Sequence, residues 1–373
     1  MWRILVFLLI PFMVWGQSAH PILAIGSPAP NFSLPGVDGK THALADYASS
    51  PILVVIFTCN HCPIAQMYER RIQELASDYR DKGVAVVAIQ PNDPKAIRID
   101  ELDSSDISDS LEEMKIRVEY KQLTYPYLYD GDTQSVTRNY GPQATPHVFV
   151  FDQTRHLQYE GRVDNSYRTE LVKTPDARNA IDALLAHEEV PIKHTGVFGC
   201  STKWQEKQAS RIEALQRLDA LPVKLEPATA DDLKKLRTNP TRKIMLVSLW
   251  ATWCGSCVHE FADLEDTYRM YSVRDLAYVT VSTNMPDEKK SVLRMLKNMH
   301  STSRNLLFAS EDTVALQTAF DPKWESAVPY TVATDGNVLY QKLGPVDILE
   351  LRRKILANLP SDYIGFNKYW MSE

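Results

Sequence analysis

The sequence predicts an α/β protein built from two similar units in tandem. An apolar, strand-like run that ends in a Cys-x-x-Cys turn and continues into a helical pattern occurs twice, at residues 52–79 and 244–271. Both units continue with alternating strands and helices and close with a hairpin and a helix, which is typical of an α/β core with an antiparallel end. The length of 373 residues also exceeds what one core normally serves.

The first unit is assigned to residues 24–204. Pro and Gly punctuate residues 20–50 and predict a loop and a hairpin. The continuously apolar, β-branched run at 52–58 is typical of a strand buried on both faces. Apolar residues then recur at helical spacing up to Tyr79. The other expected elements are a strand over 84–89, a mostly helical stretch over 91–121, a strand over 127–130, a helix over 135–140, a hairpin of 148–151 and 157–161, and a helix over 175–187.

The second unit is assigned to residues 225–360, after a charged helical linker at 205–224. Its expected elements are helices over 230–236, 258–271, 288–299, 315–320 and 349–359, strands over 244–250, 276–282 and 328–333, and a hairpin turn at Asp335 and Gly336. The C-terminal tail, 361–373, has no interpretation.

The N-terminus predicts a secretory signal peptide over residues 1–19. A positive start at Arg3 precedes an apolar run over 4–15, and small residues follow. A membrane anchor is the alternative, but the run is short for a spanning helix. We therefore expect an exported protein, periplasmic or extracellular, in a compartment where disulfides persist. The net charge of −6 and the lack of a basic block argue against a nucleic-acid partner.

The two Cys-x-x-Cys pairs predict thiol–disulfide chemistry. Two residues between the cysteines, at the start of a helix, let the thiols close a small disulfide ring. The first cysteine lies at the helix N-terminus, where free N–H groups and the macrodipole favour a thiolate. The second, one turn inward, resolves the mixed disulfide. Cys59 and Cys254 are thus the expected nucleophiles, and Cys62 and Cys257 the resolving thiols.

A shared four-cysteine zinc site is the alternative use of two such pairs. The pairs are separated by 195 residues (254 minus 59), and each lies in its own unit, which disfavours zinc. No metal and no organic cofactor are expected.

Two further residues are candidate modulators of the first site. His61 lies between its cysteines, and an imidazolium beside a thiolate makes the disulfide more oxidising. The hypothesis is that the first site has a higher reduction potential than the second; an exposed histidine without effect is the alternative. Cys200 is the odd cysteine of five, and either a third redox partner or a buried, inert residue.

These motifs resemble the thioredoxin superfamily in both units. Residues 253–260, with Val328 and Pro329 downstream, resemble the exported TlpA/ResA-type thioredoxin-like reductases. Residues 58–63, 144–149 and 199–204 resemble the redoxin family (AhpC/TSA-like) near the peroxiredoxins. The resemblance covers about 24–204 and 225–360, and it implies two tandem thioredoxin-fold domains, each with a mixed central sheet flanked by helices.

The resemblance also implies a substrate-binding feature beside each cysteine pair. Pro146 and Pro329 would be cis and would lie against the Cys-x-x-Cys turn. The backbone of the preceding residue, Thr145 or Val328, would then be exposed for strand-like pairing with a substrate chain.

Thioredoxins carry a buried acid six residues before the first cysteine, but Leu53 and Ser248 occupy those positions here. The proton acceptor for the resolving cysteine is therefore unassigned. Glu260 is a candidate, and a solvated helix residue is the alternative reading of this position.

The predicted function is that of an exported thiol-disulfide oxidoreductase, which reduces, oxidises or relays electrons to protein disulfides. The expected partners are protein thiols and disulfides and an upstream thiol electron donor, for which a membrane-associated protein is one candidate. Such an activity would serve redox homeostasis.

Two alternatives stay open. One is a thiol peroxidase, with antioxidant activity, in which the second unit feeds the first; against it, Ile56 stands where peroxiredoxins have a threonine, three residues before the reactive cysteine. The other is a copper-binding chaperone that uses Cys59, Cys62 and His147.

Overall fold

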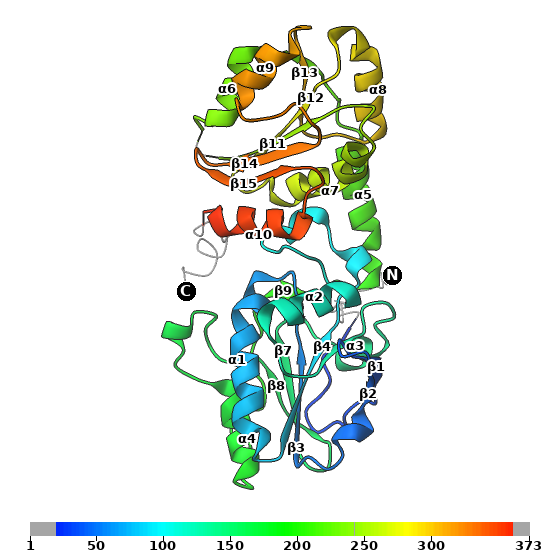
Figure 1. Cartoon of the computed structure of the whole chain (residues 1–373). Helices are drawn as coiled ribbons and strands as arrows, with labels where there is room; N and C mark the ends of the chain where they lie inside the picture. Colours follow the sequence, from blue (N-terminus) through cyan, green and yellow to red (C-terminus); the bar gives the residue numbers. More distant parts are fainter. Residues whose placement is uncertain (1–19, 242, 361–373) are drawn as a thin grey trace, which may run out of the picture.

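Two mixed β-sheets, each flanked by helices, form the centres of two α/β halves in this computed structural model (Figure 1). The structure describes residues 20–241 and 243–360, so the predicted signal peptide at 1–19 and the tail at 361–373 lie outside the described residues. Within these ranges, no helix combines the length and hydrophobicity that a membrane span requires. The α/β class predicted from the sequence is confirmed.

The first half contains a five-stranded sheet. Its elements are β1 (Ser33–Pro35), β2 (Thr41–Ala43), β3 (Ile52–Phe57), α1 (Pro63–Arg80), β4 (Val84–Gln90), α2 (Leu111–Lys121), β5 (Tyr127–Tyr129), α3 (Ser135–Tyr140), β6 (Ala144–Thr145), β7 (His147–Phe151), β8 (Leu157–Gly161), α4 (Asp176–Leu185) and β9 (Cys200–Ser201). The strand order is β5-β4-β3-β7-β8; β3 pairs in parallel with β4 and antiparallel with β7. A separate pair, β6 with β9, lies beside the first cysteine pair.

The second half repeats this pattern in a six-stranded sheet. Its elements, with the preceding linker helix, are α5 (Gln208–Asp219), β10 (Glu226–Ala228), α6 (Ala230–Thr238), β11 (Ile244–Trp250), α7 (Gly255–Tyr271), β12 (Leu276–Ser282), α8 (Lys289–Asn298), β13 (Arg304–Phe308), α9 (Thr313–Phe320), β14 (Tyr330–Thr334), β15 (Val338–Leu343) and α10 (Ile348–Asn358). The strand order is β10-β13-β12-β11-β14-β15, and β11 is again parallel to one neighbour and antiparallel to the other. Each Cys-x-x-Cys turn therefore follows the equivalent strand of its sheet.

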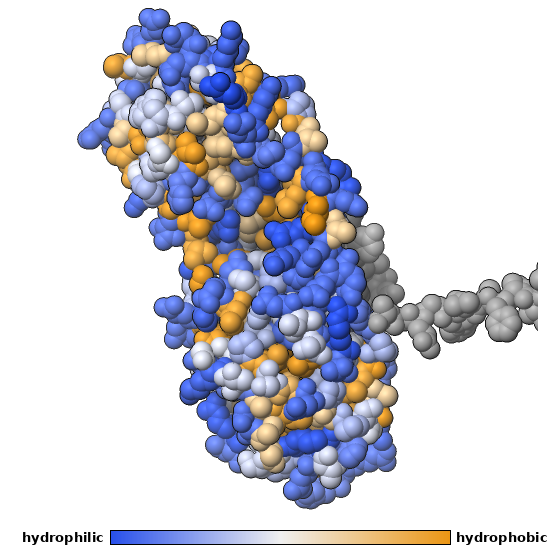
Figure 2. All heavy atoms as spheres, turned by 90° about the vertical axis from the view of Figure 1, so that its right-hand side faces the viewer, coloured by the Kyte–Doolittle hydropathy of each residue, from blue (hydrophilic) through white to orange (hydrophobic). Residues whose placement is uncertain are grey.

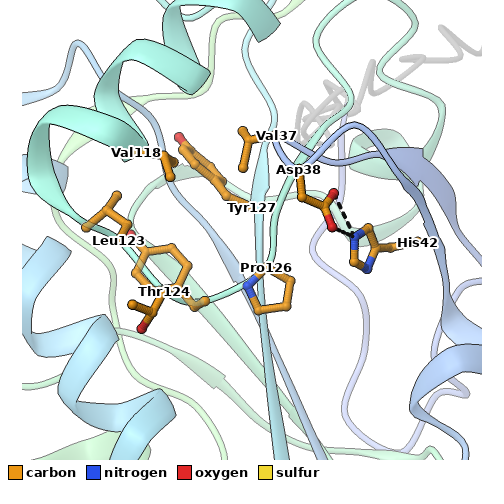
Figure 3. A pocket seen from close by; sticks show the side chains of 9 residues that line it. Val37, Asp38, His42, Val118, Leu123, Thr124, Pro126 and Tyr127 are labelled. Carbon is orange, nitrogen blue, oxygen red and sulfur yellow. Dashed lines mark hydrogen bonds and ion pairs between the residues drawn. The ribbon is translucent and has the colours of Figure 1, made fainter.

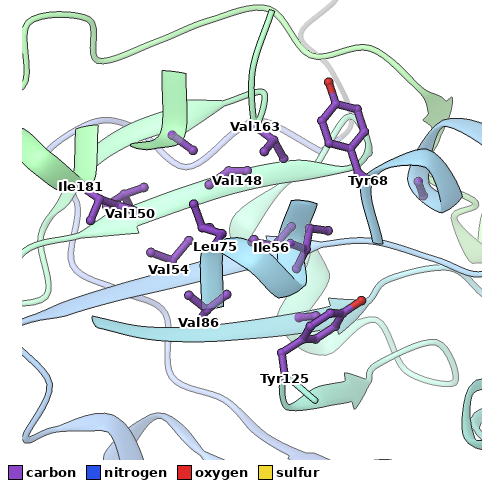
Figure 4. Close-up of a cluster of buried hydrophobic side chains, with 14 of the residues drawn as sticks. Val54, Ile56, Tyr68, Leu75, Val86, Tyr125, Val148, Val150, Val163 and Ile181 are labelled. Carbon is purple, nitrogen blue, oxygen red and sulfur yellow. The ribbon is translucent and has the colours of Figure 1, made fainter. Parts of the chain in front are cut away.

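The central strand of the first half is buried on both faces because successive side chains point to opposite sides of a sheet. Val54 and Ile56 contribute to the core beneath α1 and α4, where Leu75 and Val148 also lie (Figure 4). The alternate residues of β3, from Leu53 to Phe57, contribute to a second core on the other face. Burial on both faces fixes the position of the turn that follows β3.

One expected element is wrong. Residues 91–110 are not mostly helical; they contain only the short 3₁₀ turns η2 (Pro94–Ala96) and η3 (Ile99–Leu102) before α2 begins. Pro91 and Pro94 disfavour a continuous helix, and Ile99 and Leu102 instead pack against the core of the second half. The short strands β10 and β13 were also missed.

The 91–110 segment is the main bridge between the halves. The Tyr271 hydroxyl donates to the carbonyl of Ser105 (2.7 Å), and the Arg353 guanidinium donates to the Asp106 carboxylate (2.7 Å). Helix α5 runs along the same junction (Figure 1). On the face shown in Figure 2, hydrophobic side chains form small separate groups among hydrophilic ones.

Candidate redox sites

The second site is a disulfide at the start of a helix. Cys254 and Cys257 are bonded to each other, Cys254 is the N-cap of α7, and the backbone N–H of Cys257 lies 3.2 Å from Cys254 Sγ. The peptide bond between Val328 and Pro329 is cis, and the carbonyl oxygen of Val328 lies 3.6 Å from Cys254 Sγ. The sequence-predicted residues of this site are thus brought together.

Exposed apolar side chains flank this disulfide in the sequence. Trp253, directly before Cys254, is 69% exposed, and Val258, directly after Cys257, is exposed as well. Met285 is also exposed; its neighbour Asn284 accepts from the backbone N–H of Thr252 (3.0 Å). Exposed aromatic and apolar residues are what a protein-binding surface offers.

The first site is built differently, because its helix begins later. Helix α1 starts at Pro63, so Cys62, and not Cys59, is the N-cap. Proline favours the first position of a helix, where its missing N–H costs nothing. Both thiols are free and buried, with exposed fractions of 2% for Cys59 and 0% for Cys62. The predicted position of Cys59 at the helix N-terminus is wrong.

A carboxylate that the sequence analysis missed, Asp109, holds the first turn in place. Its Oδ1 accepts from the backbone N–H groups of Asn60 (2.9 Å) and His61 (3.0 Å). Its Oδ2 lies 2.6 Å from His61 Nδ1 and accepts from Asn92 (2.8 Å). His61 is 1% exposed, so the expectation of an exposed histidine is wrong.

His61 and Asp109 form a buried ion pair. Burial alone would lower the pKa of His61, but the charge of Asp109 and the hydrogen bond to it raise that pKa. Burial alone would raise the pKa of Asp109, but the charge of His61 and the hydrogen bond to it lower that pKa. The pair is neutral overall; the imidazolium of His61 lowers the pKa of Cys62, and the carboxylate of Asp109 raises the pKa of Cys59.

Cys62 is the sulfur that this environment favours as a thiolate. Burial opposes the charge, but hydrogen bonds from Cys200 and Cys59, and the charge of His61, hold the pKa of Cys62 well below its usual range. Burial, together with Cys62 as its neighbour, raises the pKa of Cys59 well above the usual range. The electrostatic order of the two thiols is the reverse of the expected one.

Cys200 belongs to the first site. Its backbone N–H lies 3.2 Å from Cys62 Sγ, and its thiol has a raised pKa, chiefly because it donates a hydrogen bond to Cys62. The strand that carries it, β9, pairs antiparallel with β6, so that Cys200 lies opposite Thr145. Cys200 therefore lies in contact with the first cysteine pair.

Thr145 and Pro146 lie against the first cysteine pair, and the bond between them is cis. The Thr145 hydroxyl is 3.1 Å from Cys59 Sγ, and its carbonyl oxygen is 3.5 Å from Cys62 Sγ. The backbone that was expected to face a substrate chain is, however, paired with the protein's own residues 200–201.

Glu260 is not a solvated helix residue. It is buried, its Oε2 accepts from the backbone N–H of Val346 (2.9 Å), and burial raises its pKa. Its Oε1 has no hydrogen-bond partner among the described residues. It lies one turn after Cys257 on α7, which keeps it a candidate proton acceptor.

His147 does not serve the copper alternative. Its Nδ1 accepts from the backbone N–H of Gln143 (3.2 Å), and its Nε2 lies 2.8 Å from the Glu160 carboxylate. Both ring nitrogens are therefore engaged away from Cys59 and Cys62. A copper site of two thiolates and this imidazole is not formed here.

In the described part of the chain, one other group has metal-ligating side chains close together: Cys59, His61 and Asp109, whose candidate ligand atoms lie within 4.8 Å. The ion pair joins His61 to Asp109, and the bond from the Asn60 N–H to Asp109 brings the turn that carries Cys59 next to them. A hollow of about 300 Å³ lies elsewhere on the first half, beside the ion pair of Asp38 and His42 (Figure 3). None of its lining residues is a cysteine, but the hydroxyl of Tyr127, which lines it, donates to Asn60 Oδ1 in the first Cys-x-x-Cys turn (3.3 Å).

The first half matches a known family. Residues 25–160 match the AhpC/TSA family. The chain is 27% identical over 133 residues to a thiol-disulfide oxidoreductase ResA from Geobacillus thermodenitrificans, covering 35% of this chain and 65% of that protein. It is 26% identical over 121 residues to a thiol:disulfide interchange protein DsbE from Allochromatium vinosum, covering 31% of this chain and 62% of that protein. The chain thus spans slightly less than two thirds of the length of these relatives.

A solved structure of an uncharacterized conserved protein from Geobacillus kaustophilus is also similar. Its identity is 36%, with 49% of this chain and 93% of that chain covered and a TM-score of 0.44. Together with the mixed sheets flanked by helices, the match to the AhpC/TSA family and the two oxidoreductase relatives support placing the chain in the thioredoxin superfamily.

Proposed function

We propose that this protein is an exported thiol-disulfide oxidoreductase whose second site exchanges disulfides with partner proteins. The observation that carries the proposal is the disulfide of Cys254 and Cys257 at the start of α7, next to Pro329 and an exposed Trp253. The two oxidoreductase relatives support the same activity. Export rests on the sequence of residues 1–19.

The proposed reaction uses the residues of this site alone. The reduced Cys254 thiolate attacks a sulfur of the substrate disulfide and displaces one substrate thiolate. Cys257 then attacks Cys254, releases the second substrate thiol and restores the disulfide. The N-terminal N–H groups of α7 favour the thiolate of Cys254, and the backbone of Val328 can pair with the substrate chain.

The reductase activity is tested with insulin disulfides as substrate and dithiothreitol as electron source. We compare the full chain with Cys254→Ser/Cys257→Ser and, as the matched control, Cys59→Ser/Cys62→Ser. The first double variant should fall to the rate of dithiothreitol alone, whereas the second should keep most of the activity. A wild-type rate equal to that of dithiothreitol alone would contradict the proposal.

A thiol peroxidase at the first site is the second candidate, because residues 25–160 match the AhpC/TSA family. The raised pKa of Cys59 and the presence of Ile56 argue against it. Hydrogen peroxide consumption by the Cys254→Ser/Cys257→Ser protein, with dithiothreitol as reductant, separates the two functions. Consumption that depends on Cys59 would favour the peroxidase.

A further inference from the structure

The segment that carries Cys200 lies where a substrate chain is expected at the first site. Cys200 pairs antiparallel with Thr145, the residue that precedes the cis proline, Pro146. Strand-like pairing at this position is the mode by which an extended substrate would bind. In the described part of the second half, no strand pairs with Val328. The first site therefore holds a cysteine-bearing strand of its own chain.

The three sulfurs of the first site are arranged around Cys62. The backbone N–H of Cys200 lies 3.2 Å from Cys62 Sγ, and Cys59 lies three residues before Cys62 in the same turn, so either could become its disulfide partner. Cys59 and Cys62 are buried, whereas Cys200 is partly exposed. Access to a thiol limits its exchange rate. Cys200 is thus the sulfur through which an external thiol can reach this site.

The Cys200 strand is anchored on its C-terminal side. The backbone N–H of Lys203 donates to the Asn92 side chain (2.8 Å), and the Lys203 ammonium bonds to Glu101 (2.6 Å). The Thr202 hydroxyl donates to the carbonyl of Pro142 (2.7 Å). These bonds fix Cys200 beside Cys62.

Gly199 allows the strand to approach closely. Its φ is +138°, and a Cβ at this position would lie 2.1 Å from the carbonyl oxygen of Thr145. A side chain would therefore push the strand away from the site.

We propose that Cys200 is a catalytic thiol and that the first site works through a disulfide between Cys62 and Cys200, as an oxidant of accessible protein dithiols. The proposal rests on the proposed function, thiol–disulfide exchange, and extends it to a third cysteine. It assigns Cys59 to a supporting position beside Cys62.

The proposed exchange has two steps. A substrate thiolate attacks Cys200 Sγ, the bond between Cys62 and Cys200 breaks, and Cys62 leaves as a thiolate. The second substrate thiol then attacks the sulfur bound to Cys200, forms the substrate disulfide, and Cys200 leaves and is protonated. Two electrons pass from the substrate dithiol to the pair, one proton stays on Cys200 and one is released. A protein disulfide reoxidises the pair by the reverse steps.

The sulfur that is attacked follows from the leaving group. A thiol of low pKa leaves faster in disulfide exchange, and Cys62 is the thiol that His61 and its hydrogen bonds stabilise as a thiolate. Attack at the partly exposed Cys200 with departure of the buried Cys62 therefore combines the accessible sulfur with the better leaving group.

The test maps disulfides in the full chain with the second site silenced by Cys254→Ser/Cys257→Ser. The protein is equilibrated with oxidised glutathione, trapped with a thiol reagent and digested, and linked peptides are identified by mass spectrometry. We expect peptides linked through Cys62 and Cys200, with Cys59 free. Adding Cys59→Ser should preserve this link, and adding Cys200→Ser should abolish it.

Two other outcomes would distinguish a failure of the role proposed for Cys200 from a failure of thiol–disulfide exchange as the function. A link between Cys59 and Cys62 that survives Cys200→Ser would overturn the role of Cys200 but leave thiol–disulfide exchange intact. If no disulfide forms in the first half at any glutathione ratio, the inference is overturned. The insulin assay still tests the second site by itself.

A second variant changes the strand without removing a sulfur. Gly199→Ala should lower the fraction of linked Cys62 and Cys200 several-fold. Gly196→Ala is the matched control, because a Cβ there meets nothing within 4 Å, and it should behave like wild type. Equal linkage in both variants would contradict the role of the strand. Circular dichroism checks that both glycine variants are folded. If one of them does not fold, the disulfide mapping described above still tests the proposal, because it uses a protein with both glycines intact.

Discussion

The two Cys-x-x-Cys turns follow equivalent strands, β3 and β11, yet their helices begin at different cysteines. At the second site Cys254 is the N-cap and faces the N–H of Cys257, three residues on. At the first site Cys62 is the N-cap, and the backbone N–H that lies near its Sγ, at 3.2 Å, comes from Cys200. The start of the helix, and not the order of cysteines in the motif, thus decides which sulfur lies at the helix N-terminus.

The two sites also differ in access. Cys254 is 7% exposed and follows the exposed Trp253, whereas Cys62 is 0% exposed and lies against the strand that carries Cys200. In the reduced protein, a bulky maleimide should therefore label Cys254 at least ~100-fold faster than Cys62, because an opening free energy of about 2.8 kcal/mol is enough for that factor. Mass spectrometry of labelled peptides over time measures the ratio. Equal labelling rates would show that the strand carrying Cys200 does not restrict access to Cys62.

The loops of the two sites are held by groups of different charge. Asp109→Asn breaks a buried ion pair and should cost about 3–5 kcal/mol of unfolding free energy. At the second site the corresponding turn is held by a neutral amide, so Asn284→Ala should cost about 1–3 kcal/mol. Urea denaturation of both variants measures the difference. A smaller effect for Asp109→Asn than for Asn284→Ala would contradict this reading.

The same ion pair gives the first half a pH dependence of stability. The pKa of Asp109 is lowered, so its contribution is present above its ordinary pKa of 3.8 and is lost as the pH falls through the lower folded pKa. The pKa of His61 is raised, so its contribution is complete below 6.5 and is lost as the pH rises through the higher folded pKa. Between pH 3.8 and 6.5 the pair of His61 and Asp109 should make its full contribution to the unfolding free energy. Denaturation of the wild type across pH should show this window, and Asp109→Asn should lose it.

The thiolate of the first site should belong to Cys62. With the second site silenced, the thiolate ultraviolet absorbance at neutral pH should persist in Cys59→Ser and disappear in Cys62→Ser. Each unit by which the pKa of Cys62 is lowered corresponds to about 1.4 kcal/mol. Persistence of the signal in Cys62→Ser would assign the thiolate to another cysteine.

The smallest expected effect concerns Trp253, the exposed residue directly before Cys254 at the second site. Trp253→Ala should change the unfolding free energy by no more than about 0.5 kcal/mol, because the side chain is exposed. It should weaken substrate binding by about 1 kcal/mol or more, which is roughly fivefold in KM. Steady-state kinetics with insulin measures this. An unchanged KM would remove Trp253 from the binding surface.

The sequence predicted the parts of the fold that depend on local patterns. Strands 244–250 and 276–282 and helix 135–140 occur at the expected bounds, because apolar runs and turn residues delimit them. The 91–110 segment was mispredicted because its apolar residues pack against a distant half.

The site shows the same division. Both cysteine pairs and both cis prolines could be located from motifs, but the reversal at Cys62 depends on where α1 begins. The role of Asp109 could not be predicted, because the sequence around it shows only a run of Ser and Asp residues and no motif. The pairing of Cys200 with Thr145 joins residues far apart in the chain, which a local pattern does not encode.

The bridge formed by residues 91–110 has a consequence for dissecting the protein. Within a few residues, Asp106 bonds to Arg353 of the second half and Asp109 bonds to His61 of the first site. A fragment that ends before α5 would uncover Ile99 and Leu102 and would lose the far attachment of this segment. We expect such a fragment to have an altered Cys62 environment, so the two halves form a single chemical unit although each has its own sheet.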